Sequence, residues 1–294
     1  MTVKSDSDTA ILIVGHGTKS RQGIEQFNSV IDMLKDQARL PVGQAFIEFA
    51  EPNIQNGLAN LVALVKPKHI IVVPLLLLAA GHVKTDVPSE IAKARIAYNK
   101  ITFHYARDLS ITPQLLDIVE DRSLHPFSGM KSVVGLRSQP EYTLLVGRGS
   151  SDPDANSDLY KIARLLSERG RLGQVEPAFI SLAKPGVPES LDRLRLLGAK
   201  RITVVPYFLF TGTLLERIYS QTRAWLNSNP AIPVQLAREM GPDPRIVELI
   251  NQRVAETLSG GSAMNCDMCV YHNQVQTHVH SMSNPSTSVA RHHQ

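Results

Sequence analysis

Two sequence patterns in the first half of this chain recur in the same order in the second half. This repeat constrains the fold more than any other feature of the sequence. Residues 142–150 match residues 10–18, since each segment is a short apolar run that ends in a glycine turn. Residues 202–210 match residues 70–78, since each is a longer apolar run with a proline near its middle. A chain that repeats such patterns in the same order is expected to fold as two copies of one unit.

The spacing of single positions supports a true repeat. His16 and Arg148 each stand between the two glycines of the turn, and Pro74 and Pro206 occupy the same place in the apolar run (148 − 16 = 206 − 74 = 132). The offset holds to within one residue at two further pairs of positions, Glu48 with Ser181 and Arg107 with Arg238. Agreement at four landmarks is hard to obtain by chance, so the two copies are expected to share one fold.

Within each copy, apolar strands alternate with amphipathic helices. In the first copy we expect strands at residues 10–14, 44–51, 70–78 and 101–106, each followed by a segment of helical periodicity. The run at 70–78 is apolar throughout, with β-branched residues at its start, as is typical of a strand buried on both faces. Such alternation implies right-handed β-α-β units and parallel sheets. We therefore predict an α/β protein made of two tandem four-stranded parallel-sheet units.

A segment without periodicity separates the two copies. Residues 125–141 contain prolines, serines and glycines in no regular order, which is typical of a linker. We expect an N-terminal domain at residues 9–124 and a C-terminal repeat domain at residues 142–259. A tail rich in cysteine and histidine follows at residues 260–294.

Composition excludes several classes of protein. The chain has 43% hydrophobic and 20% charged residues, which suits a globular protein, and its net charge of +4 fits an acidic small molecule better than nucleic acid. The longest apolar run is broken by Pro74 and falls short of the ~20 residues that a membrane-spanning helix needs. The amino terminus lacks the apolar core of a signal peptide. We expect a cytoplasmic protein without a nucleic-acid or membrane partner.

Three polar residues of the first copy fall at or near the carboxyl ends of predicted strands. They are His16, Glu48 and His82. The carboxyl ends of parallel strands meet at one edge of a sheet, so the three side chains are expected to converge on one crevice. Imidazoles and a carboxylate suit first-row divalent metals and leave coordination positions open. The same groups can also accept protons.

The second copy lacks all three of these groups. Arg148, Ser181 and Leu214 stand at the corresponding positions, and Lys184 stands where the first copy has Glu51. Taken alone, a residue such as His16, Glu48 or His82 is more often structural than functional. A structural role does not readily explain why all three are absent from the second copy. We therefore expect the active site in the first copy, with the second copy as a degenerate repeat.

The motifs resemble those of the long, two-domain form of the sirohydrochlorin chelatase family, which inserts cobalt or iron into sirohydrochlorin in cobalamin or siroheme biosynthesis. The resemblance is carried by residues 14–18, 46–52 and 73–82, and residues 146–154 and 206–210 are similar to the second half of the family. It covers about residues 10–271. It implies a class II chelatase-like fold and a lyase of porphyrin biosynthesis that takes Co²⁺ or Fe²⁺ as a substrate.

The resemblance also implies roles for the residues. His16 and His82 would bind the metal with Glu48, His16 would accept a pyrrole proton, and Glu48 would assist deprotonation. Sirohydrochlorin carries many carboxylates, so cations at the rim of the cleft are expected to bind it. The substrate contacts expected from sequence position are Glu51, Leu78, Ala79, Ala80, Gly81, Lys84 and Arg107.

The tail contains a pair of cysteines, Cys266 and Cys269, among many histidines. Relatives of the long form carry a similar motif that is associated with an iron–sulfur cluster. Two cysteines do not supply the four thiolates that such clusters usually take, so a cluster here would need other ligands or a homodimer joined through the tail. Binding of another metal, or none, is the alternative.

Two other functions remain open from the sequence. A metal or tetrapyrrole carrier would use the same ligands without turnover. A phosphoryl-transfer enzyme would use His16 as a nucleophile, but histidine phosphatases have an arginine immediately before that histidine, and this chain has Gly15. The inserted metal is also open, because the same ligand types serve cobalt, iron and nickel.

Overall fold

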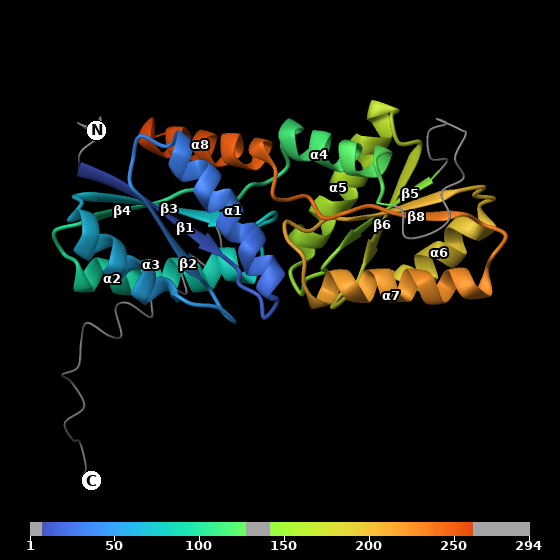
Figure 1. Ribbon diagram of the computed structural model, residues 1–294, viewed down its shortest axis with the longest axis horizontal. Coiled ribbons are helices and arrows are strands. Elements are labelled where there is room, and N and C mark those ends of the chain that lie inside the picture. The colour runs from blue at the N-terminus through green and yellow to red at the C-terminus, as the bar shows by residue number, and fades with distance from the viewer. Residues whose placement is uncertain (1–7, 128–141, 261–294) are drawn as a thin grey trace, which may run out of the picture.

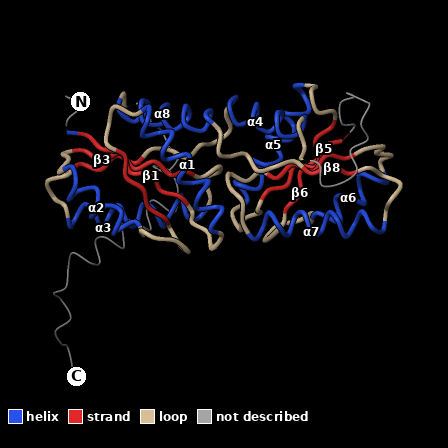
Figure 2. The backbone as a smooth tube through the Cα atoms, in the orientation of Figure 1, coloured by secondary structure: helices blue, strands red, loops and turns tan. Residues whose placement is uncertain are grey.

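The computed structural model describes residues 8–127 and 142–260 of the chain. Two α/β units lie side by side along the long axis of the molecule, and each has helices on both faces of a sheet (Figures 1 and 2). Both sheets are parallel throughout. The strand orders are β2-β1-β3-β4 and β6-β5-β7-β8, so the second sheet repeats the topology of the first. The prediction of two tandem four-stranded α/β units is confirmed.

The elements of the first copy follow the predicted alternation. They are β1 (Thr9–Gly15), α1 (Arg21–Gln37), β2 (Val42–Phe46), α2 (Ile54–Val65), β3 (His69–Leu75), the π-helix η2 (His82–Asp86), α3 (Val87–Ala97), β4 (Thr102–Tyr105) and α4 (Pro113–Leu124).

The elements of the second copy repeat this order. They are β5 (Tyr142–Gly147), α5 (Pro153–Arg169), β6 (Gln174–Phe179), α6 (Val187–Leu196), β7 (Ile202–Pro206), α7 (Thr213–Ser228), β8 (Val234–Leu236) and α8 (Pro244–Leu258). The register is also repeated, since Val14 pairs with Pro74 and Val146 pairs with Pro206.

Strand β2 ends earlier than the sequence indicates. A strand was expected to residue 51, but β2 ends at Phe46. The N–H groups of Ile47 and Glu48 still bond to the carbonyl oxygens of Gly15 and His16, and the chain turns away at Phe49, whose left-handed φ of 62° a strand cannot continue through. Glu48 therefore lies on a loop beyond the strand.

The closing helices of the two copies are exchanged. Helix α4 packs against β7 and α5 of the second copy, and α8 packs against β3 and α1 of the first copy. Figure 1 shows α8 above the first sheet and α4 above the second. One apolar core consequently contains residues of both copies, among them Ile11, Leu115, Leu145 and Ile246. The two copies are therefore joined by shared packing and not by a linker alone.

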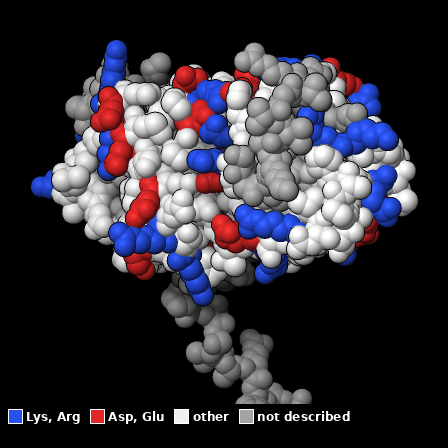
Figure 3. All heavy atoms as spheres, turned by 45° about the vertical axis from the view of Figure 1, so that its right-hand side comes forward, with Lys and Arg blue, Asp and Glu red and all other residues white. Residues whose placement is uncertain are grey.

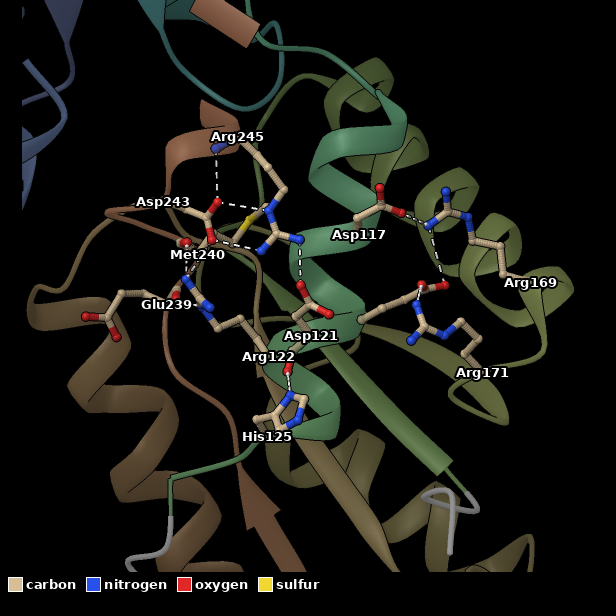
Figure 4. A network of polar contacts seen from close by, with 11 residues as sticks. Asp117, Asp121, Arg122, His125, Arg169, Arg171, Glu239, Met240, Asp243 and Arg245 are labelled. Atoms are coloured by element: carbon tan, nitrogen blue, oxygen red, sulfur yellow. Dashed lines mark hydrogen bonds and ion pairs between the residues drawn. The ribbon is translucent and has the colours of Figure 1, made fainter. Parts of the chain in front are cut away.

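Polar contacts hold α4 against the second copy (Figure 4). The Arg122 side chain donates hydrogen bonds to the carbonyl oxygens of Glu239 and Met240, each over 2.9 Å. On the same helix, the Asp121 carboxylate accepts a hydrogen bond of 2.5 Å from Arg245. The two bonds from Arg122 satisfy main-chain acceptors of the second copy, and the bond from Arg245 adds an ion pair to the same helix.

Charges of both signs are interspersed on the face of the molecule shown in Figure 3. Within residues 8–127 and 142–260, no helix combines the length and apolarity needed to cross a bilayer. Residues 261–294, which hold Cys266 and Cys269, lie outside the described residues. The predicted metal ligands of the tail and the homodimer through the tail therefore stay predictions.

Candidate active site

A cleft of about 770 Å³ is lined by residues of both copies. Its walls include Tyr207, directly after β7, and the carboxyl ends of five strands, at Gly15, Phe46, Leu75, Gly147 and Phe179. This is the edge at which parallel sheets bind ligands. The volume lies within the range of about 300–1,000 Å³ that is typical of small-molecule sites.

A glycine turn places His16 beside Glu48. Gly17 has a φ of 91°, and a Cβ at this position would lie 1.8 Å from the carbonyl oxygen of Glu48. The backbone N–H of Glu48 in turn donates a 3.0 Å hydrogen bond to the carbonyl oxygen of His16. Only glycine permits this approach, so the turn after β1 is locked against the loop after β2.

The orientation of the His16 ring follows from its contacts. Nδ1 lies 3.1 Å from the carbonyl oxygen of Gly17. A carbonyl only accepts hydrogen bonds, so Nδ1 is the donor of this contact, and in a neutral ring Nε2 then carries the lone pair. Nε2 lies 3.2 Å from Oε1 of Glu48. The imidazole and the carboxylate therefore lie next to each other at this turn.

The second copy contributes a cation to this pair. Nη1 of Arg148 lies 3.1 Å from Nε2 of His16. These two residues are equivalent positions of the repeat, and they meet across the cleft. An arginine donates and never accepts, which agrees with a lone pair on Nε2. The sequence comparison assigned the active site to the first copy, whereas the structure places Arg148 of the second copy in direct contact with His16.

His82 is the first residue of the π-helix η2. Single-turn π-helices are frequent at functional sites. The side chain of His82 lies outside the described part of the structure. Among the described residues, no three His, Cys, Asp or Glu side chains form a group that could hold a metal ion. The three-ligand site therefore stays a prediction, of which the His16–Glu48 pair is the described part.

Lys84 and Arg107 are engaged in ion pairs with the second copy. Nζ of Lys84 lies 2.7 Å from Oδ2 of Asp152 and 3.3 Å from Oδ2 of Asp154. Burial lowers the pKa of Lys84, but its hydrogen bonds to the two carboxylates outweigh burial, so its pKa is raised. Arg107 forms two hydrogen bonds with Glu256, of 3.0 and 3.1 Å.

The position of these two cations differs from the expected one at the rim. Neither Lys84 nor Arg107 is among the residues that line the cleft. The physical reason is that carboxylates of the second copy, which no local pattern of the first copy could reveal, lie close enough to neutralise both side chains.

The other expected substrate contacts divide into two groups. Leu78, Ala80 and Gly81 line the cleft, while Ala79 and Glu51 do not. The Glu51 carboxylate instead accepts a 2.8 Å hydrogen bond from the backbone N–H of Asn53, the residue that caps α2. Its contact in the structure is therefore local.

The cleft also holds residues that the sequence reasoning missed. Phe49 and Leu182 line it, with 56% and 69% of their surfaces exposed. They are equivalent positions of the repeat, and their φ angles of 62° and 54° are both left-handed. Such a backbone costs a bulky residue on the order of 1–3 kcal/mol and is typical of functional sites. In the sequence, the only sign of their role was that the repeat places these two apolar residues at equivalent positions.

Lys19 is a further cation of the cleft lining. Its Nζ lies 5.6 Å from the centre of the Phe49 ring, within the range of a cation–π contact. It follows the glycine turn that carries His16. Together with Arg148 it supplies positive charge to the cleft from both copies.

Fold and site together define a two-copy α/β protein with a histidine–carboxylate pair at a cleft between the copies. The sequence profile of the CbiX family matches residues 10–125 and again residues 142–257. The chain is 34% identical over 274 residues to a sirohydrochlorin cobaltochelatase of Priestia megaterium, which covers 92% of this chain and 87% of that protein. It is 30% identical over 260 residues to a sirohydrochlorin ferrochelatase of the same organism, which covers 88% and 94%.

A solved structure is similar over nearly the same extent. SirB from Bacillus subtilis with Fe³⁺ superposes with a TM-score of 0.72 and 30% sequence identity, covering 86% of this chain and 96% of SirB. The chain belongs to the CbiX family. The family that the motifs predicted is confirmed, and the two profile matches coincide with the two copies of the repeat.

Proposed function

We propose that this chain is a sirohydrochlorin chelatase, which inserts Co²⁺ or Fe²⁺ into sirohydrochlorin. The observation that carries the proposal is the His16–Glu48 pair, with Nε2 and Oε1 3.2 Å apart beside the cleft. Both Priestia megaterium relatives are named for this reaction, one with cobalt and one with iron. The metal is a substrate that enters and leaves with each turnover.

The chemistry requires two kinds of group. Two pyrrole N–H protons must leave the macrocycle, and the cation must pass from protein ligands to the four ring nitrogens. The lone pair on Nε2 of His16 and the carboxylate of Glu48 can each bind a metal or accept a proton. We propose His82 as the second imidazole ligand. A sparse ligand set suits transfer, because a closed four-ligand site would retain the ion.

Binding of the macrocycle needs both charge and apolar surface. We propose Lys19 and Arg148 as the cations that pair with its carboxylates, since both line the cleft whereas Lys84 and Arg107 already pair with carboxylates of the protein. Phe49 and Leu182 present apolar surface from the two copies and are proposed to contact the faces of the ring.

A multiple-turnover assay tests the proposal. Sirohydrochlorin is incubated anaerobically with Co²⁺, Fe²⁺ or Ni²⁺ and a small amount of enzyme, and the change in the absorption spectrum of the macrocycle is followed. We expect more metallated product than enzyme with Co²⁺ or Fe²⁺. Product that never exceeds the enzyme concentration would contradict turnover and favour a carrier of metal or tetrapyrrole.

A further inference from the structure

The backbone at Arg148 is fixed in the same way as the backbone at His16. Gly149 has a φ of 84°, and a Cβ there would lie 2.0 Å from the carbonyl oxygen of Ser181. The N–H of Ser181 donates a 2.9 Å hydrogen bond to the carbonyl oxygen of Arg148. The repeat therefore presents Arg148 at the cleft in the way that it presents His16, and the two side chains meet.

The contact occupies the nitrogen on which the reaction depends. Nδ1 of His16 is committed to the carbonyl of Gly17, which leaves Nε2 for a metal or a proton. Nη1 of Arg148 lies 3.1 Å from that nitrogen and donates to its lone pair. A metal bound to imidazole lies about 2.0–2.1 Å from the nitrogen. A divalent ion and the guanidinium therefore cannot share the lone pair, on grounds of both space and charge.

The same contact explains the position of Glu48. In the neutral ring Nε2 does not donate, so Nε2 and Oε1 of Glu48 are two acceptors at 3.2 Å. The guanidinium beside Nε2 carries a positive charge, which opposes the repulsion between these two acceptors. Arg148 thus places a positive charge beside Nε2 of His16 and Oε1 of Glu48. A divalent cation can replace that charge once the guanidinium moves away.

Arg148 is also the group that a substrate carboxylate can reach. Its side chain is exposed and lines the cleft. A guanidinium–carboxylate pair is charge-assisted and often bidentate, so it is stronger than a single bond from arginine to a neutral imidazole. A polycarboxylate in the cleft would therefore draw Arg148 away from His16.

We propose that Arg148 closes the metal site of the free protein and opens it when a carboxylate of the macrocycle binds the guanidinium. The proposal rests on the proposed function. It makes Arg148 a positioning residue that couples binding of the macrocycle to binding of the metal at His16. The metal then binds after the macrocycle, so the ion is taken up only when the macrocycle that will receive it is already bound.

A titration with Co²⁺ alone tests the closed state. The wild type, Arg148→Ala and Arg164→Ala are titrated without macrocycle, and binding is followed by calorimetry or by the visible absorption of Co²⁺. Arg164 is a matched control, since its exposed side chain pairs with Glu168 on the surface of α5. We expect Arg148→Ala to bind Co²⁺ about tenfold more tightly, as loss of one competing hydrogen bond of about 1.4 kcal/mol implies. Unchanged or weaker binding overturns the proposal.

A double mutant separates occupation of Nε2 from a general charge effect. In the His16→Ala background, Arg148→Ala is expected to leave the affinity for Co²⁺ unchanged, because the nitrogen that Arg148 covers is gone. An equal gain in both backgrounds would mean that removal of one positive charge is sufficient, and the proposal would fail. These measurements need no insertion, so they can fail while the chelatase assay succeeds, and the reverse.

The kinetics test the open state. Arg148→Ala is expected to raise KM for sirohydrochlorin several-fold while lowering the apparent KM for Co²⁺. A merely structural role would impair both substrates in the same direction. A rise in both values therefore overturns the proposal.

Discussion

Arg122 and Arg253 make the same pair of hydrogen bonds in opposite directions across the molecule. Arg122 on α4 donates to the carbonyl oxygens of Glu239 and Met240, at 2.9 Å each. Arg253 on α8 donates to the carbonyl oxygens of Asp108 and Leu109, at 2.8 Å each. All three pairs of positions are related by the repeat, with an offset of 131 (253 − 122 = 239 − 108 = 240 − 109). Each exchanged helix is thus fastened by an equivalent arginine.

Removal of one of these two arginine side chains is expected to destabilise the whole molecule. Arg253 is fully buried, so Arg253→Ala leaves two buried carbonyl oxygens without their donor, and we expect a loss of about 2–4 kcal/mol in the free energy of unfolding. Arg164→Ala, at an exposed ion pair, is expected to change it by less than about 0.5 kcal/mol. Urea denaturation measures both. Equally small effects of the two substitutions would show that the hydrogen bonds of Arg253 contribute little to the free energy of unfolding.

The ligand residues are expected to be needed for insertion and not for folding. His16→Ala, Glu48→Gln and His82→Ala should each reduce turnover by about 100-fold or more, because they remove a metal ligand or proton acceptor. Ser181→Ala, at the position equivalent to Glu48, is the control and should retain most activity. Turnover rates are compared after circular dichroism has established that each variant is folded. Near-normal turnover of any of the three would remove its assigned role.

The left-handed backbone at Phe49 predicts that a glycine variant is more stable than an alanine variant, the reverse of the usual order. Phe49→Gly and Phe49→Ala both remove the ring, but only glycine adopts a φ of 62° without strain. We expect the glycine variant to be more stable than the alanine variant by about 1 kcal/mol. Both variants should raise KM for sirohydrochlorin more than they lower kcat, since the exposed ring faces the cleft. Thermal denaturation and steady-state kinetics measure the two effects, and alanine as the more stable variant would contradict the argument.

Asp108 is expected to make stability depend on pH. Burial raises the pKa of its carboxyl to about 7, although the positive charge of Arg253 opposes the shift. From about pH 4 to pH 7 the folded protein therefore holds a proton that the unfolded chain has released, so the free energy of unfolding falls as the pH rises. The slope attributable to this group is at most about 1.4 kcal/mol for each pH unit.

Asp108→Asn should remove this dependence. The amide is neutral at every pH, so we expect the variant to be more stable than the wild type at about pH 8 and to lose less stability between about pH 5 and pH 8. Urea denaturation at the two pH values measures the difference. The same slope in both proteins would show that Asp108 does not hold its proton.

The tail is expected to affect metal supply and not the chemical step. Deletion of residues 261–294 should leave turnover unchanged at saturating metal and reduce it when metal is scarce, since tethered ligands raise the local concentration of an ion. Turnover is measured over a range of Co²⁺ concentrations. Loss of activity at saturating metal would place the tail in the active site, and equal activity at every concentration would leave it without a role in metal handling.

The sequence by itself determined the fold of each copy and the edge of the sheet at which the site lies. Apolar runs and helical periodicity are local signals, and the offset between His16 and Arg148 revealed the repeat. Gly17 indicated a tight turn after the first strand, and that turn does present His16 at the cleft. Such features are predictable because each depends on neighbouring residues and on the general geometry of parallel sheets.

Only the tertiary structure decided how the two copies are joined and which charges face the cleft. The partner of Arg107, Glu256, lies 149 residues away, and the partner of Lys84, Asp152, lies 68 residues away. Arg148 reaches His16 because the two copies face each other. Periodicity carries no information on such contacts, since an ion pair between distant segments depends on the packing of the whole chain. The exchange of α4 and α8 is of the same kind, because either sheet offers an equivalent apolar face to each helix.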